Sequence, residues 1–98
     1  MLKIDQADLD IVLKIAKMEI PDAKIFAFGS RVYGEPRDRS DFDIAVSGAT
    51  PEHFQQFKDY LSVAPTSIRI DASNYDYLAD WLRQIVDEKG EQIFPLQN

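Results

Sequence analysis

The N-terminal quarter of the chain shows helical periodicity that gives way to a continuous apolar run. From Asp5 onward, apolar residues recur every three or four positions, and Pro21 ends the pattern. This spacing predicts an amphipathic helix. Residues 25–28 are all apolar and precede Gly29, which predicts a short buried strand that stops at the glycine. The predicted helix would bury Leu9, Val12, Leu13 and Ala16.

The middle of the chain predicts a turn, a loop, a second strand and a second helix. Residues 30–34 can form one helical turn, and residues 35–40 are polar with one proline, which is typical of a surface loop. Residues 41–46 predict a second strand. Thr50 can cap a helix whose first residue is Pro51. The apolar side of this helix would carry Phe54, Phe57 and Leu61.

The C-terminal third predicts one more strand and one more helix. Residues 67–71 alternate polar and apolar side chains, which favours a third strand ending at Asp71. We expect Ser73 or Asn74 to cap the last helix, Gly90 to end it, and residues 91–94 to add a short edge strand. The aromatic residues of this part fit a core-facing stripe, with an exposed docking patch as the alternative; they are Tyr75, Tyr77 and Trp81.

The order of these elements favours an α+β fold. Helices and strands alternate irregularly, which is typical of a small mixed β-sheet with helices packed on it. With 98 residues and 45% hydrophobic content, the chain has the size of one domain with one core. We therefore expect a single domain over residues 1–98.

The charge balance restricts the partners that the protein can attract. Seventeen acidic residues outnumber eleven lysines and arginines, which gives a formal net charge of -6. Nucleic-acid backbones and anionic membranes attract clustered cations, so we expect neither direct nucleic-acid binding nor membrane binding. The absence of cysteine excludes thiolate metal sites and disulfides. Because no apolar run has the length of a signal peptide or a membrane span, a cytoplasmic protein is expected.

The turn after the first strand has the features of a phosphate site. Gly29 and Ser30 lie where that strand meets the helical turn closed by Gly34, a place where free backbone N–H groups can converge on an anion. Three arginines follow, which could contact phosphate oxygens or balance neighbouring carboxylates; they are Arg31, Arg37 and Arg39. The predicted nucleotide-binding residues are Gly29, Ser30, Arg31 and Arg39.

Carboxylates on two predicted strands suggest a divalent metal site. Asp41 and Asp43 are two residues apart, so their side chains project from one face of a strand, roughly 7 Å apart along the backbone. Oxygen ligands suit Mg²⁺ or Mn²⁺, and a pair of such ions stabilises the attacking and leaving oxygens of a phosphoryl displacement. Asp71 is the best third carboxylate, as a metal ligand or as the acceptor of the attacking group's proton.

Together these residues resemble a known family. Gly29-Ser30, ten intervening residues, Asp41-x-Asp43 and a later strand carboxylate at Asp71 resemble the polymerase-beta-type nucleotidyltransferase superfamily. The chain is similar over nearly its whole length to the minimal nucleotidyltransferases (MNT) encoded beside HEPN proteins in bacteria and archaea. The resemblance implies that the Gly-Ser turn holds a triphosphate and that Asp41, Asp43 and Asp71 are the catalytic and metal-binding residues.

The resemblance also implies a reaction and a partner. Members of HEPN/MNT pairs transfer AMP from ATP, with Mg²⁺, to a tyrosine of the HEPN ribonuclease toxin, so this chain would be the antitoxin and could form a hetero-oligomer with the toxin. So short a chain leaves little room for an acceptor pocket of its own, which favours a protein acceptor. Two alternatives remain open: a non-catalytic module that occludes its partner, and a nucleotidyltransferase for a small molecule such as an aminoglycoside.

Overall fold

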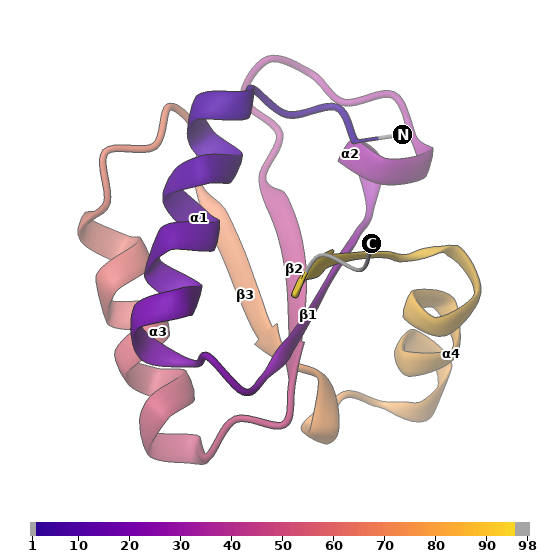
Figure 1. Ribbon diagram of the computed structural model, residues 1–98. Coiled ribbons are helices and arrows are strands. Elements are labelled where there is room, and N and C mark those ends of the chain that lie inside the picture. Colours follow the sequence, from indigo (N-terminus) through magenta and orange to yellow (C-terminus); the bar gives the residue numbers. More distant parts are fainter. Residues whose placement is uncertain (1, 96–98) are drawn as a thin grey trace.

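A computed structural model describes residues 2–95, and its elements follow the predicted order (Figure 1). The predicted α+β class is confirmed, as are the strand before Gly29, the turn after it and the C-terminal edge strand. The elements are α1 (Gln6–Glu19), β1 (Lys24–Phe28), α2 (Ser30–Tyr33), β2 (Phe42–Ser47), α3 (Pro51–Val63), β3 (Ile70–Asn74), the 3-10 turn η1 (Tyr75–Tyr77), α4 (Asp80–Lys89) and β4 (Glu91–Phe94).

Four strands form one mixed sheet in the order β3-β2-β1-β4. β1 pairs antiparallel with both β2 and β4, whereas β2 and β3 are parallel. Consequently the end of β1 meets the beginnings of β2 and β3 at one end of the sheet. In that register Phe28 lies opposite Asp43, and Asp43 lies opposite Asp71.

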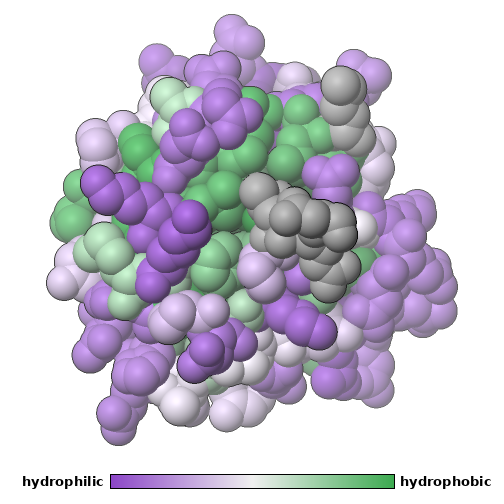
Figure 2. Space-filling model, in the orientation of Figure 1, coloured by the Kyte–Doolittle hydropathy of each residue, from purple (hydrophilic) through white to green (hydrophobic). Residues whose placement is uncertain are grey.

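The core lies between the sheet and the helices α1 and α3, which run side by side on one of its faces (Figure 1). In the same orientation, hydrophobic residues gather between α1 and β4, and the outline of the molecule is mainly hydrophilic (Figure 2). Because strand side chains alternate, Asp43 projects from the sheet face opposite these helices. The core includes Val12, Ala16, Ile25, Phe42, Ile44, Val46, Phe57 and Leu61. Within residues 2–95, no helix is long and apolar enough to cross a membrane.

The third strand begins later than the sequence predicted. We expected residues 67–71, but β3 is Ile70–Asn74, so Asp71 is its second residue and not its last. Ser67 cannot join the sheet because its N–H and hydroxyl both donate to the buried carboxylate of Asp8 in α1. The hydroxyl of Thr66 donates to the carbonyl of Ile68, which also holds this segment outside the sheet.

The last helix also begins later, at Asp80 rather than after Ser73 or Asn74. Asn74 does act as a cap, but of the turn η1, where its side chain accepts from the N–H of Asp76. The carboxylate of Asp76 then accepts hydrogen bonds from the end of β2 and anchors the turn there.

The core-facing aromatic stripe was wrong for two of its three members. Tyr77 and Trp81 are 75% and 66% exposed. Tyr75 is half-buried, with its ring 5.9 Å from that of Phe26, and lies outside the hydrophobic core. The turn η1 interrupts the helical repeat on which the prediction depended.

Candidate active site

The turn from β1 into α2 brings backbone into close contact with a carboxylate. Gly29 has φ +81°, a conformation that favours glycine. A Cβ added to Gly29 would lie 2.5 Å from Oδ2 of Asp43, so only glycine fits this approach. The next residue, Ser30, begins α2, and the N–H groups of Val32 and Tyr33 both donate to the carbonyl of Gly29. The amides of Ser30 and Arg31 precede the first intrahelical bond and are the donors that such a turn leaves for another acceptor.

The sheet brings the three predicted aspartates to one place. Asp41 immediately precedes β2, Asp43 is the second residue of β2, and Asp71 lies opposite Asp43 in β3. The pKa of Asp43 is raised from 3.8 to about 6, first by burial of the carboxyl group and then by the negative charges of Asp71 and Asp41. The positive charge of Arg69 lowers the pKa in part. Mutual repulsion among these carboxylates therefore acts on Asp43.

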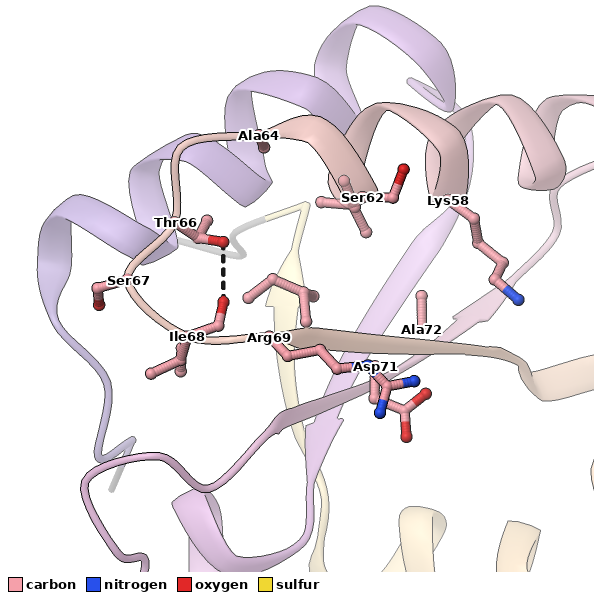
Figure 3. Close-up of a pocket in the computed structure, with 11 residues that line it drawn as sticks. Lys58, Ser62, Ala64, Thr66, Ser67, Ile68, Arg69, Asp71 and Ala72 are labelled. Carbon is pink, nitrogen blue, oxygen red and sulfur yellow. Dashed lines mark hydrogen bonds between the residues drawn. The ribbon is translucent and has the colours of Figure 1, made fainter.

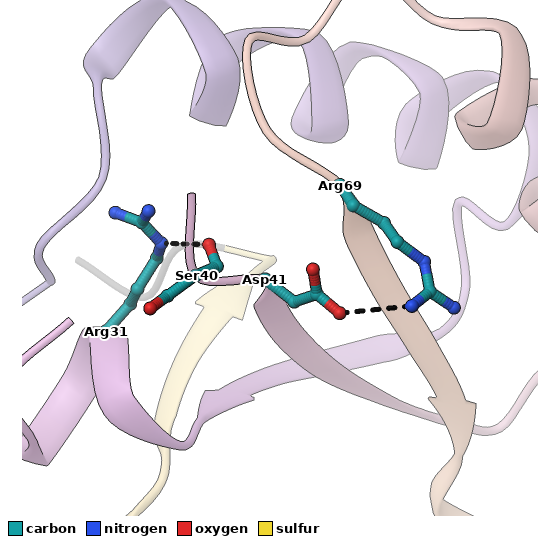
Figure 4. Close-up of polar contacts among 4 residues, drawn as sticks. All are labelled: Arg31, Ser40, Asp41 and Arg69. Atoms are coloured by element: carbon teal, nitrogen blue, oxygen red, sulfur yellow. Dashed lines mark hydrogen bonds and ion pairs between the residues drawn. The ribbon is translucent and has the colours of Figure 1, made fainter. Parts of the chain in front are cut away.

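Arg69 belongs to this cluster although the sequence did not identify it as a site residue. Its Nη1 lies 3.1 Å from Oδ2 of Asp41, as Figure 4 shows. Arg69 is two residues before Asp71, so both side chains point to the same side of the chain, and this spacing was the signal that could have identified it. The guanidinium neutralises part of the acidic cluster.

The donor chemistry of the cluster fits a hard divalent cation. All three side chains offer carboxylate oxygens, the ligands that Mg²⁺ and Mn²⁺ prefer, and the pKa of Asp43 is raised by burial and, after that, by the negative charges of Asp71 and Asp41. Among residues 2–95, however, no three Asp, Glu, His or Cys side chains are already drawn together as a metal-ligand set. Asp41 is instead held by Arg69, so a metal bound by Asp41 would have to replace that ion pair.

The side chain of Arg31 joins the loop 35–40 to the N-terminal segment through hydrogen bonds. It is only 8% exposed. Its guanidinium donates to four backbone carbonyls, those of Lys3 (2.8 Å), Ser40 (2.9 Å), Arg37 (3.2 Å) and Asp38 (3.2 Å). The contact with Ser40 is drawn in Figure 4. These contacts are with carbonyls rather than with carboxylates, and they engage the side chain that the sequence assigned to phosphate.

Arg39 differs from Arg31 in its surroundings. It is exposed in the loop 35–40, two residues before Asp41. Together with the Gly29-Ser30 turn, it remains a predicted phosphate contact.

Comparison with known proteins agrees with this geometry. Residues 9–93 match the nucleotidyltransferase domain family. The probable protein adenylyltransferase MntA of Haemophilus influenzae is 31% identical over 88 residues, which cover 87% of this chain and 77% of that protein.

Two solved structures are similar in fold. A toxin–antitoxin structure with AMP-PNP has a TM-score of 0.72 at 26% identity, over 92% of this chain and 75% of that chain. A mutant of the MntA–HpeT toxin–antitoxin has a TM-score of 0.68 at 23% identity, over 91% and 74% of the two chains. The family match spans both the Gly29-Ser30 turn and the three aspartates, and the chain therefore belongs to the nucleotidyltransferase domain family, as a minimal member of the MntA type.

Proposed function

We propose that this chain, as a single domain, is an antitoxin that transfers AMP from ATP to a tyrosine of a HEPN ribonuclease toxin. The observation that carries the proposal is the alignment of Gly29, Asp43 and Asp71 across three neighbouring strands. The Gly29-Ser30 turn lies directly beside Asp43 and Asp71, and a phosphate site next to carboxylates is the pairing that nucleotidyl transfer requires. The relative named as a protein adenylyltransferase supports a protein acceptor.

The nucleotide would be held by the turn and the loop beside it. Phosphate oxygens would accept hydrogen bonds from the backbone amides of Ser30 and Arg31 and from the hydroxyl of Ser30. Arg39 would supply a positive charge from the loop 35–40. ATP as the substrate is supported by the AMP-PNP in the related toxin–antitoxin structure. The side chain of Arg31 is not included, because its guanidinium already serves four carbonyls.

The chemical step is a displacement at the α-phosphorus of ATP. The tyrosine oxygen forms a bond to this phosphorus, the bond from phosphorus to the oxygen bridging to the β-phosphate breaks, and pyrophosphate leaves with that electron pair. The phenolic proton passes to a carboxylate, for which Asp71 is placed beside Asp43. Mg²⁺ or Mn²⁺, held by Asp41, Asp43 and Asp71, would neutralise charge that develops on the phosphates. ATP and Mg²⁺ point to the cytoplasm as the compartment.

Intact mass spectrometry tests this proposal. The chain is incubated with Mg²⁺, ATP and the protein encoded by the adjacent gene, which we propose to be the HEPN toxin, and this partner is weighed. We expect the mass of one or more AMP groups on the partner, with tyrosine as the modified residue in peptide mapping. Chelation of the metal and Asp43→Asn should each abolish the added mass, while Asp22→Asn, in an exposed turn before β1 at the end of the sheet opposite to the site, should leave it unchanged.

The two alternative functions give different results in the same experiment. A module that acts by occlusion would bind and silence the partner without adding mass. A small-molecule transferase would release pyrophosphate from ATP in the presence of an aminoglycoside and without any protein partner. Either result would reject the proposed reaction.

A further inference from the structure

A groove runs between the C-terminal end of α3 and the start of β3, next to the carboxylate cluster. Its volume is about 590 Å³. The groove continues along the segment 64–68 and reaches Asp71, as Figure 3 shows. It therefore leads from the surface to one of the three aspartates of the candidate active site.

One wall of this groove is the outer edge of the sheet. β3 is the last strand in the order β3-β2-β1-β4. The carbonyl of Arg69 accepts from the N–H of Phe42 in the neighbouring strand at 2.9 Å, so the backbone of Arg69 faces inward. Since successive residues of a strand direct their N–H and C=O groups to opposite sides, the backbone groups of Ile70 and Ala72 point outward. Both residues line the groove.

The groove carries positive charge in an acidic protein. Lys58 extends from α3 toward β3 in Figure 3, and Arg69 lies beside Asp71. Arg69 is paired with Asp41 and Asp71 is itself acidic, whereas Lys58 forms no ion pair within residues 2–95, so Lys58 is the cation of the groove that an acidic side chain of a partner can contact. The floor between Lys58 and Arg69 is apolar, with Leu61, Ile70 and Ala72. This combination suits an extended peptide that has an acidic side chain among apolar ones.

We propose that the groove is the acceptor site, and that an extended segment of the acceptor protein adds to the outer edge of β3. Its main chain pairs with the outward groups of Ile70 and Ala72. Because side chains alternate along a strand, the acceptor tyrosine projects to the face of Asp71 while its two neighbours project into the groove. One of these neighbours is acidic and contacts Lys58. This inference rests on the proposed transfer to a protein tyrosine and adds how that tyrosine is selected.

Hydrogen exchange tests the edge pairing without any catalytic turnover. In the free chain, the outward amides of Ile70 and Ala72 should exchange faster than the inward amides of Asp71 and Ser73. Saturation with the HEPN partner should slow Ile70 and Ala72 by about tenfold or more, because each new main-chain bond closes an open amide. Unchanged exchange at both residues in a saturated complex overturns the proposal. The proposal is also overturned if a single-stranded RNA of random sequence slows amide exchange at Ile70 and Ala72 and the protein partner does not.

Charge reversal at Lys58 tests the contact with the acidic neighbour. Lys58→Glu should raise the KM for the partner by about tenfold and leave kcat unchanged, since an exposed charge acts on binding rather than on chemistry. Lys24→Glu is the matched control: Lys24 is exposed and pairs with Ser47 at the opposite end of the sheet, so its KM should stay at the wild-type value. A partner variant with Lys in place of the acidic neighbour should recover the KM with Lys58→Glu.

The two proposals fail in distinguishable ways. If the wild-type chain adds no AMP to the partner, the transfer reaction is rejected while hydrogen exchange still tests the groove. If transfer occurs and Lys58→Glu has the same KM as Lys24→Glu, the groove is rejected as the acceptor site and the reaction stands.

Discussion

The backbone of Gly29 touches the carboxylate of Asp43. No side chain fits between them, since a Cβ on Gly29 would lie 2.5 Å from Oδ2 of Asp43. The contact joins the end of β1 to the second residue of β2, so the turn proposed to bind phosphate and the carboxylate proposed to bind metal are fixed relative to each other by sheet register. The proposed catalytic geometry therefore depends on a position that carries no functional group.

Gly29→Ala tests this dependence. The substitution should cost about 1 kcal/mol in free energy of unfolding from its positive φ and should also displace Asp43, lowering AMP transfer by more than about tenfold. Gly48→Ala separates the two effects: Gly48 has φ +86°, but its added Cβ would lie 3.9 Å from the nearest atom. Urea unfolding should show the cost of the positive φ in Gly48→Ala and a larger loss in Gly29→Ala, whose Cβ also meets Asp43, whereas only Gly29→Ala should impair transfer. Equal activity in the two would mean that the contact has no catalytic role.

Asp43 should make the metal-free protein less stable as the pH rises. Its pKa is about 6 in the folded chain against an ordinary 3.8, so between these values the folded state binds more protons than the unfolded state. The stabilisation is complete below about pH 4 and is lost as the pH rises through 6. Allowing for the solvent exposure of this carboxyl, we expect about 1 kcal/mol.

Asp43→Asn should remove that loss. Without metal it should be more stable than the wild type at pH 8 by about 1 kcal/mol and equal to it near pH 4, as measured by urea unfolding with a chelator present. The increase in Tm on adding Mg²⁺ should disappear. A Tm increase that persists in Asp43→Asn would show that Asp43 is not a metal ligand.

The sequence predicted the parts of the site that depend on local patterns. The apolar run before Gly29, the glycine itself and the strand carrying Asp43 are all legible from neighbouring residues, and the structure has them where they were expected. The start of β3 was missed because Ser67 bonds to Asp8, a residue 59 positions away. No local pattern reports such a contact.

The same limitation applies to Arg31. Its position after Gly29-Ser30 favoured phosphate, yet its acceptors come from Lys3 and from the loop 35–40. The fold brings these carbonyls around the side chain. The exposed aromatic residues Tyr77 and Trp81 were likewise assigned to the core from helical spacing that the turn η1 breaks.

Arg31 and Arg39 should therefore respond differently to substitution. Arg31→Lys loses the planar fork and leaves part-buried backbone carbonyls without donors, so it should destabilise the fold by about 2 kcal/mol. Where the variant is still folded, its affinity for ATP should remain close to that of the wild type. Arg39→Ala should change stability by less than about 0.5 kcal/mol and weaken ATP binding severalfold. Urea unfolding and ATP titration measure both quantities, and the opposite pattern would make Arg31 the phosphate ligand.

Arg69 should compete with the metal for Asp41. Its guanidinium lies 3.1 Å from the carboxylate of Asp41, and its positive charge lowers the raised pKa of Asp43 in part. The side chain of Arg69 is 73% exposed, so the ion pair contributes less than about 1 kcal/mol to stability. Arg69→Gln should therefore leave the Tm nearly unchanged and bind Mg²⁺ more tightly, by roughly fivefold if the full ~1 kcal/mol no longer opposes binding. Calorimetric titration without the partner protein isolates this effect from acceptor binding.

Arg83→Gln is the control, because Arg83 forms a comparable exposed pair with Asp80 on α4 and its substitution should not alter Mg²⁺ affinity. If Arg69→Gln binds Mg²⁺ no more tightly than Arg83→Gln, Asp41 reaches the metal without giving up Arg69, and the ion pair is part of the metal-bound site.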